Sequence, residues 1–98
     1  MKHVNKKQVG QSEFQDEKTK LIYSLKYYQL IYQNFNKNET YYGASVEKTL
    51  NQEILEVAYS GSITEDLNEI DSLLKILELG AVTPCVLCEV LDELMCST

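Results

Sequence analysis

Apolar residues recur at helical spacing along the first part of the chain, where one stripe runs in steps of three or four residues with a single polar interruption at Lys18. The stripe consists of Phe14, Leu21, Leu25, Tyr28, Tyr32 and Phe35. Steps of this size place side chains on one face of an α-helix. Aromatic and β-branched residues would also suit a strand over residues 21–32, but strict alternation of apolar and polar positions fails there. The pattern therefore predicts a first helix over residues 12–35.

A loop and a second helix are predicted next. Residues 34–44 are rich in Asn and contain Gly43, and both residue types continue a helix poorly. Ser45 is a good N-cap, because its hydroxyl can accept a bond from a free backbone amide of the first turn. The second helix is expected over residues 46–59, and Gly61 supplies a left-handed stop after it.

Two shorter helices complete the predicted fold. The third repeats the same steps at Ile63, Leu67, Ile70, Leu74 and Leu77. Ser62 or Thr64 would cap its start, and Gly80 sits where a C-terminal cap glycine belongs. Thr83 and Pro84 form an N-cap and first-turn pair that opens a fourth helix over residues 84–95. We therefore expect an all-α fold, a small antiparallel helical bundle of about four helices.

The opening segment is expected to lie outside this bundle. Residues 1–11 are polar and basic, contain two valines and show no period. The expected organisation is a flexible basic tail over residues 1–11 and a single helical domain over residues 12–98. No apolar signal segment opens the chain and no run is long and uncharged enough to span a membrane, so we expect a cytoplasmic protein.

Charge is distributed unevenly along the 98 residues. Residues 1–37 hold seven lysines against three acids, and residues 38–98 hold two lysines against twelve acids, which gives +4 and −10. All nine cations are lysine, so the bidentate guanidinium contacts that read guanine or grip phosphate are absent from the sequence. An acidic surface repels nucleic acid and favours basic protein surfaces, although such acids also serve simply to keep a small domain soluble.

The cysteines are the most specific candidates for chemistry. Cys85 and Cys88 form a C-x-x-C motif at a predicted helix start, where a thiolate is favoured. The βαβ context of a thioredoxin-type site is missing, and the carboxylate of Glu89 would disfavour the thiolate. We expect buried, inert cysteines on an apolar helix face. The alternatives are a redox module or a zinc site in which Cys96 and His3 complete a Cys₃His set.

Other catalytic arrangements find little support in the sequence. The single histidine lies in the predicted tail, so no Cys-His or Ser-His pair is held in place. The four glycines are isolated, which excludes phosphate-binding loops. Residues 74–91 have the spacing of a helix-turn-helix, but the second helix offers acids where a DNA-binding helix offers Arg, Lys, Asn or Gln. We expect no enzyme and no cofactor, and a helix-turn-helix regulator remains an alternative.

The leading hypothesis is a non-enzymatic inhibitor or regulator that docks acidic helices on a basic surface of a larger protein. Tyrosines beside the main stripe of the first helix would anchor the contact, unless that helix is central in the bundle. The expected partner-binding residues are Tyr23, Tyr27, Leu30, Glu65, Asp66, Glu69, Glu89, Asp92 and Glu93. If the basic surface normally holds nucleic acid, the protein would act as a DNA mimic. A homodimer is also considered, whereas direct binding to nucleic acid or to a membrane is not expected.

Overall fold

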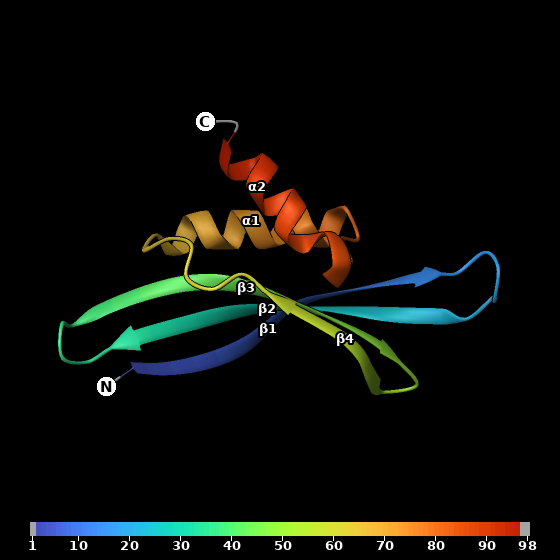
Figure 1. The fold of residues 1–98 in the computed structure, drawn as a ribbon, viewed down its shortest axis with the longest axis horizontal. Helices are drawn as coiled ribbons and strands as arrows, with labels where there is room; N and C mark the ends of the chain where they lie inside the picture. Colours follow the sequence, from blue (N-terminus) through green and yellow to red (C-terminus); the bar gives the residue numbers. More distant parts are fainter. Residues whose placement is uncertain (1, 97–98) are drawn as a thin grey trace.

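The computed structural model describes residues 2–96 and shows a four-stranded antiparallel sheet followed by helices (Figure 1). The strands lie side by side in chain order and are β1 (Lys2–Gln15), β2 (Ile22–Asn34), β3 (Glu39–Leu50) and β4 (Glu53–Tyr59). The helices are α1 (Leu67–Leu79), the single 3₁₀ turn η1 (Pro84–Val86) and α2 (Leu87–Cys96). The protein is therefore α+β, and the predicted all-α helical bundle is wrong.

The first two predicted helices are strands in the structure, and the middle of β2 is buried on both of its sides. Along β2, Leu25 and Tyr27 point toward the helices, whereas Tyr28 and Leu30 point to the other face. Leu25, Tyr27 and Leu30 are all buried, so apolar residues occur at odd and even positions alike. A strand covered on both faces does not show the alternation of a half-exposed strand. The failed alternation was therefore not evidence against a strand.

The hairpin turns were difficult to predict because they are made without glycine. Asn51 and Gln52 join β3 to β4 with φ values of 52° and 69°, the positive values of the tight turn that matches strand twist. Asn38 in the β2–β3 turn and Lys20 in the β1–β2 turn also have positive φ, at 52° and 64°. In the β1–β2 turn, the Asp16 carboxylate accepts bonds from two backbone amides. Asn, Gln and Lys give a weaker turn signal than glycine.

The predicted flexible tail is an edge strand over its described residues. β1 pairs with β2 from Lys2 to Gln15, with a bulge between Gln8 and Gly10. At this bulge the Glu78 carboxylate of α1 accepts a 2.8 Å hydrogen bond from the backbone amide of Gln11. The backbone bonds to β2 and to Glu78 order a segment that has few apolar side chains of its own.

The last two predicted helices are present, with corrected starts. α1 is capped by Asp66, whose side chain accepts bonds from the amides of Asn68 and Glu69, rather than by Ser62 or Thr64. Gly80 is the C-cap residue of α1, as predicted. Pro84 opens η1 after Thr83, and η1 leads directly into α2.

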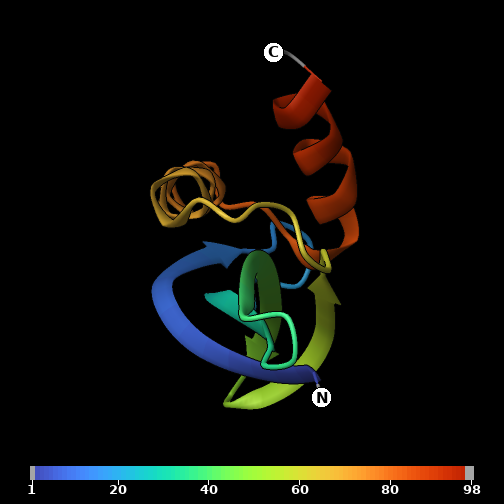
Figure 2. The same cartoon turned by 90° about the vertical axis from the view of Figure 1, so that its left-hand side faces the viewer.

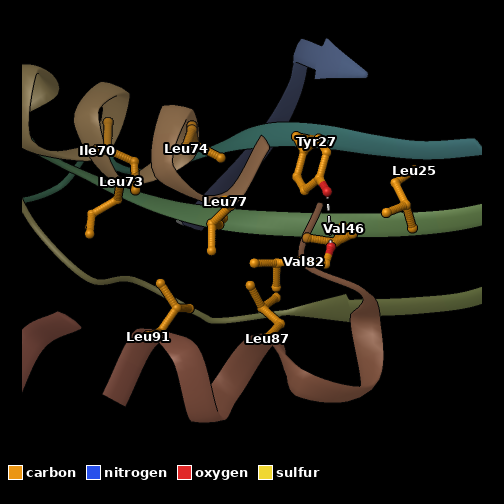
Figure 3. Packing of buried hydrophobic residues seen from close by; sticks show 11 residues of the cluster. Leu25, Tyr27, Val46, Ile70, Leu73, Leu74, Leu77, Val82, Leu87 and Leu91 are labelled. Atoms are coloured by element: carbon orange, nitrogen blue, oxygen red, sulfur yellow. Dashed lines mark hydrogen bonds between the residues drawn. The ribbon is translucent and has the colours of Figure 1, made fainter. Parts of the chain in front are cut away.

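The hydrophobic core lies between the helices and one face of the sheet (Figure 3). Leucine side chains of α1 and α2 meet Leu25 and Val46 of the central strands. Tyr27 is fully buried among them, and its hydroxyl donates a 3.0 Å hydrogen bond to the carbonyl of Val82. This bond ties the connection between the two helices to the middle of the sheet.

The chain leaves the sheet by crossing closely over Gly43. The Ser60 amide donates to the carbonyl of Ala44, and the Ser60 hydroxyl accepts from the amide of Ala44, both at 2.9 Å. Gly61 then turns with a φ of 75°, and its carbonyl oxygen lies 2.1 Å from where a Cβ on Gly43 would stand. Only glycine fits at position 43. Beyond this crossing, Thr64 returns to the edge of β3 and pairs with Tyr42.

Candidate functional site

The uneven charge of the chain coincides with the two layers of the fold. Residues 1–59, which contain the sheet, hold eight lysines and seven acids, a net of +1. Residues 60–98, which contain α1 and α2, hold eight acids and one lysine, a net of −7. The helices cover one face of the sheet (Figure 1), so the negative charge is concentrated on one side of the molecule.

The acidic residues predicted near the start of α1 are all exposed, and each has a neighbour in the structure. Asp66 caps α1, and Glu69 accepts a 3.1 Å bond from the hydroxyl of Thr64. Glu65 lies close to the hydroxyl of Tyr41, and hydrogen bonds and charge from Glu39 and Glu65 raise the pKa of Tyr41. These carboxylates therefore stabilise local structure as well as contributing negative potential.

The acidic residues of α2 are different. Glu89, Asp92 and Glu93 are exposed, and no hydrogen bond or ion pair joins them to any other residue in the described part of the chain. Figure 2 shows that α2 points away from the sheet toward its C-terminal end. Among the described residues, the three carboxylates are exposed and have no cation beside them.

The structure does not bring the three predicted anchors together beside the acids. Tyr27 is inside the core, and Leu30 is buried on the opposite face of the sheet. Tyr23 is half-buried and stacks on Phe14 with 5.3 Å between ring centroids, while the Lys48 ammonium lies 4.6 Å from the Tyr23 ring. Tyr27 and Leu30 are therefore too buried to contact a partner, and most of the Tyr23 ring packs against Phe14 and Lys48.

A second surface, which the sequence did not reveal, is the sheet face turned away from the helices, here called the open face. Small residues in its centre are covered by large neighbours: Ser45 pairs with Tyr28 on one side and with Tyr59 on the other, and all three point to this face. Large apolar side chains remain exposed toward its edges. They are Val4 on β1, Ile22 on β2, and Ile54, Val57 and Tyr59 on β4.

A polar network crosses the middle of the open face. The Glu47 residue is only 4% exposed, and its carboxylate forms an ion pair with the Lys6 ammonium two strands away. Between them, Tyr28 donates a 3.4 Å hydrogen bond to Glu47, and the Lys6 ammonium stands 4.2 Å from the centre of the Tyr28 ring. Burial raises the pKa of Tyr28, as does the nearby Glu47 carboxylate. Lys6 compensates a charge that would otherwise be buried without a cation.

A pocket of about 510 Å³ lies on the open face near the β2–β3 turn. Tyr32 and Tyr41 are cross-strand neighbours in its wall, together with Val4 of β1 and Ser62 of the crossing segment. Burial raises the pKa of Tyr32, and the neighbouring Tyr59 adds to the effect. The wall is mainly aromatic and apolar, with polar side chains at the turn. A period of two through Tyr28, Leu30 and Tyr32 was the one sequence signal for this surface.

The cysteine predictions have different outcomes. Cys85 and Cys88 are exposed, so the expectation of buried cysteines is wrong for both. The side chains of Cys96 and His3 lie outside the part that the structure describes, so the Cys₃His arrangement stays a prediction. Among the described residues, no group of three or more His, Cys, Asp or Glu is placed to hold a metal ion. No described helix is long and apolar enough to cross a membrane.

Comparison with known proteins gives a family but no function. The chain belongs to a family of unknown function, DUF6514, whose model matches residues 3–97. No curated protein and no solved structure matches the chain.

Proposed function

We propose that this DUF6514 protein is a non-enzymatic inhibitor or regulator that docks its acidic helix layer on a basic surface of a larger protein. The observation that carries the proposal is the separation of charge between the layers, with a net of −7 on residues 60–98. A surface with one sign of charge attracts an oppositely charged partner over a distance and orients its approach.

The exposed carboxylates of α2 are the expected centre of contact. Glu89, Asp92 and Glu93 follow one another within two turns of helix, and the described residues supply them with no cation. Lysine or arginine side chains of a partner would form charge-assisted bonds with them. Asp66 and Glu69 contribute long-range attraction while they keep their roles at the start of α1.

A protein partner is favoured over direct binding of nucleic acid. Binding to DNA or RNA depends largely on cations that neutralise phosphates, and the helix layer has a single lysine, Lys75. The eight lysines of residues 1–59 are balanced by seven acids, so the sheet layer is nearly neutral. A basic protein surface that itself binds nucleic acid would suit the helix layer, because carboxylates would then occupy phosphate positions.

The test compares two charge-reversed variants with the natural protein. In the first, Glu89, Asp92 and Glu93 of α2 are changed to lysine. In the matched control, three exposed acids of the sheet layer, Glu13, Glu17 and Glu53, are changed to lysine. Both variants change the net charge equally. Each immobilised protein is used to capture partners from a lysate of the native host, and the captured proteins are identified by mass spectrometry.

The proposal predicts that the natural protein and the control retain the same basic protein and that the α2 variant loses it. Binding of the purified partner should weaken steeply as salt is raised from 0.1 to 1 M, over which the Debye length falls from about 10 to 3 Å. Competition by duplex DNA for the partner would identify a DNA mimic. Equal retention by all three proteins, or binding that is indifferent to salt, contradicts the proposal.

A further inference from the structure

The thiols of Cys85 and Cys88 are a feature of the molecule that the proposed function does not use. Cys85 lies in η1, Cys88 is the second residue of α2, and both are free and exposed. Free cysteine is among the residue types that proteins bury most often. Here both side chains can be reached from solvent, which thiol chemistry requires.

One helical turn separates the two cysteines. Leu87, between η1 and Cys88, has φ and ψ of −54° and −49°, so the helical path continues from one cysteine to the other. Three residues advance about 4.5 Å in an α-helix and about 6 Å in a 3₁₀ helix, which puts the two Cα atoms about 5–6 Å apart on one side of the helix. Disulfides span Cα distances of about 4.4–6.8 Å. A disulfide between these cysteines can therefore close without unwinding the turn.

The surroundings of the pair favour disulfide exchange. The Thr83 hydroxyl lies 3.3 Å from the Cys85 sulfur. Cys88 borders a hollow of about 210 Å³ between α2 and the segment that leaves the sheet, which gives room for the group that a reacting sulfur carries. Among the described residues, no third His, Cys, Asp or Glu joins the pair in a group that could hold a metal ion, whereas a disulfide needs only the two sulfurs.

Carboxylates flank both thiols. Glu89 lies one turn beyond Cys85, and residues four positions apart are neighbours on a helix surface. Asp92 lies one turn beyond Cys88 and borders the same hollow. Their negative charge attracts a reactant that carries a cation and repels one that carries an anion. A disulfide with ammonium groups is therefore the reactant that these surroundings favour.

From the exposure, spacing and surroundings of the pair, we infer that Cys85 and Cys88 form a dithiol site that exchanges with small cationic disulfides. One protein thiolate attacks a sulfur of the reactant, which forms a mixed disulfide and releases half of the reactant as a thiol. The other protein thiolate then displaces the second half and closes the Cys85–Cys88 disulfide. Two protein thiols are thus oxidised to one disulfide, one reactant disulfide is reduced to two thiols, and two protons pass to the released sulfurs.

The test treats the purified full chain, carrying Cys96→Ser to remove the third thiol, with a small excess of cystamine at pH 8 and follows its mass. The protein should lose two hydrogen atoms and keep no adduct. Adding Cys85→Ser or Cys88→Ser should instead leave one cysteamine group attached. The matched control combines Cys88→Ser with Asp92→Cys, which places the thiols seven residues and about 10.5 Å apart along the helix, too far for a disulfide. This control should keep two adducts.

Dithiodiglycolate, which has carboxylates in place of the ammonium groups of cystamine, tests the charge preference. Glu89→Gln combined with Asp92→Asn should lower the ratio of the cystamine rate to the dithiodiglycolate rate by about tenfold at low salt. Glu13→Gln combined with Glu17→Gln, at exposed acids of the sheet layer, should leave the ratio unchanged. Circular dichroism checks that each variant is folded.

Two outcomes would overturn the inference. One is a cysteine pair that keeps two adducts and forms no internal disulfide, as the control with separated thiols does. The other is a rate ratio that does not respond to removal of the charges of Glu89 and Asp92. Neither outcome depends on the proposed partner, since no other protein is present.

Discussion

Replacing Gly43 by alanine tests the close crossing that ends the sheet. A Cβ at this position would stand 2.1 Å from the carbonyl oxygen of Gly61 and 3.1 Å from its carbonyl carbon. The obstacle is the backbone of Gly61, so the segment at residues 60–62 has to move away by roughly 1.3–1.9 Å to restore ordinary contact distances. In an unobstructed site, the same substitution would stabilise the protein by about 0.4–1 kcal/mol through the unfolded chain.

The expected loss of stability follows from the interactions that the displaced segment makes. Overpacking of this kind costs about 1–3 kcal/mol. The two hydrogen bonds between Ser60 and Ala44 are strained by the same movement, and each is worth about 0.5–1.5 kcal/mol. We therefore expect Gly43→Ala to lower the free energy of unfolding by about 2–4 kcal/mol, which corresponds to roughly 10–25 °C in Tm for a domain of this size.

Urea and thermal unfolding followed by circular dichroism measure this change, and Gly10→Ala is the control. A Cβ at Gly10 would also meet an atom, at 2.0 Å, but that atom is the carboxylate oxygen of Glu78, at the end of a flexible side chain. The Gly10 variant should lose less than about 1 kcal/mol, the worth of one exposed hydrogen bond to Gln11. If the two variants are equally stable, the reasoning about the backbone crossing is refuted.

Two further predictions concern buried polar groups. Burial, with a smaller contribution from Glu78, raises the pKa of Tyr27 to about 12, whereas an unfolded tyrosine ionises near 10. Tyr27 thus contributes stability that is complete below pH 10 and is lost as pH rises toward 12, by up to about 2–3 kcal/mol, and urea unfolding of Tyr27→Phe should lack this part of the alkaline decline. Lys6→Met leaves the Glu47 carboxylate without its cation and should cost about 1–3 kcal/mol at neutral pH, a moderate value because the Lys6 side chain is partly exposed. Adding Glu47→Gln should recover most of this loss, and a double-mutant cycle in which the two losses simply add would contradict the described pairing.

The helices near the C-terminal end were accessible to sequence reasoning because their signals are local. Ile70, Leu74 and Leu77 recur at helical spacing, and Gly80 ends α1 as its position predicts. The same spacing through Leu25, Tyr28 and Tyr32 was misleading, since these residues lie on opposite faces of a strand. Apolar residues that recur at steps of three and four can belong to a helix or to a strand that is buried on both sides.

The two candidate surfaces also differ in how far the sequence predicts them. The excess of acids in residues 60–98 is a property of the sequence, and the exposed positions of Glu89, Asp92 and Glu93 follow from the polar side of a helix that was predicted. The open face has only a weak local signal, the period of two through Tyr28, Leu30 and Tyr32. It exists only because β1 pairs with β2 and because β4 turns Val57 and Tyr59 to the side away from the helices.

The sequence by itself determined the composition, the concentration of negative charge in the last forty or so residues, and the approximate positions of α1 and α2. Tertiary structure decided that most of residues 2–59 form strands, because each strand is held by backbone hydrogen bonds to a neighbouring strand rather than within itself. It also decided that the charge difference along the chain becomes a difference between two sides of the molecule. Pairing between two strands depends on both of them and has no spacing within either one that predicts it, whereas a helix forms its hydrogen bonds within a few residues.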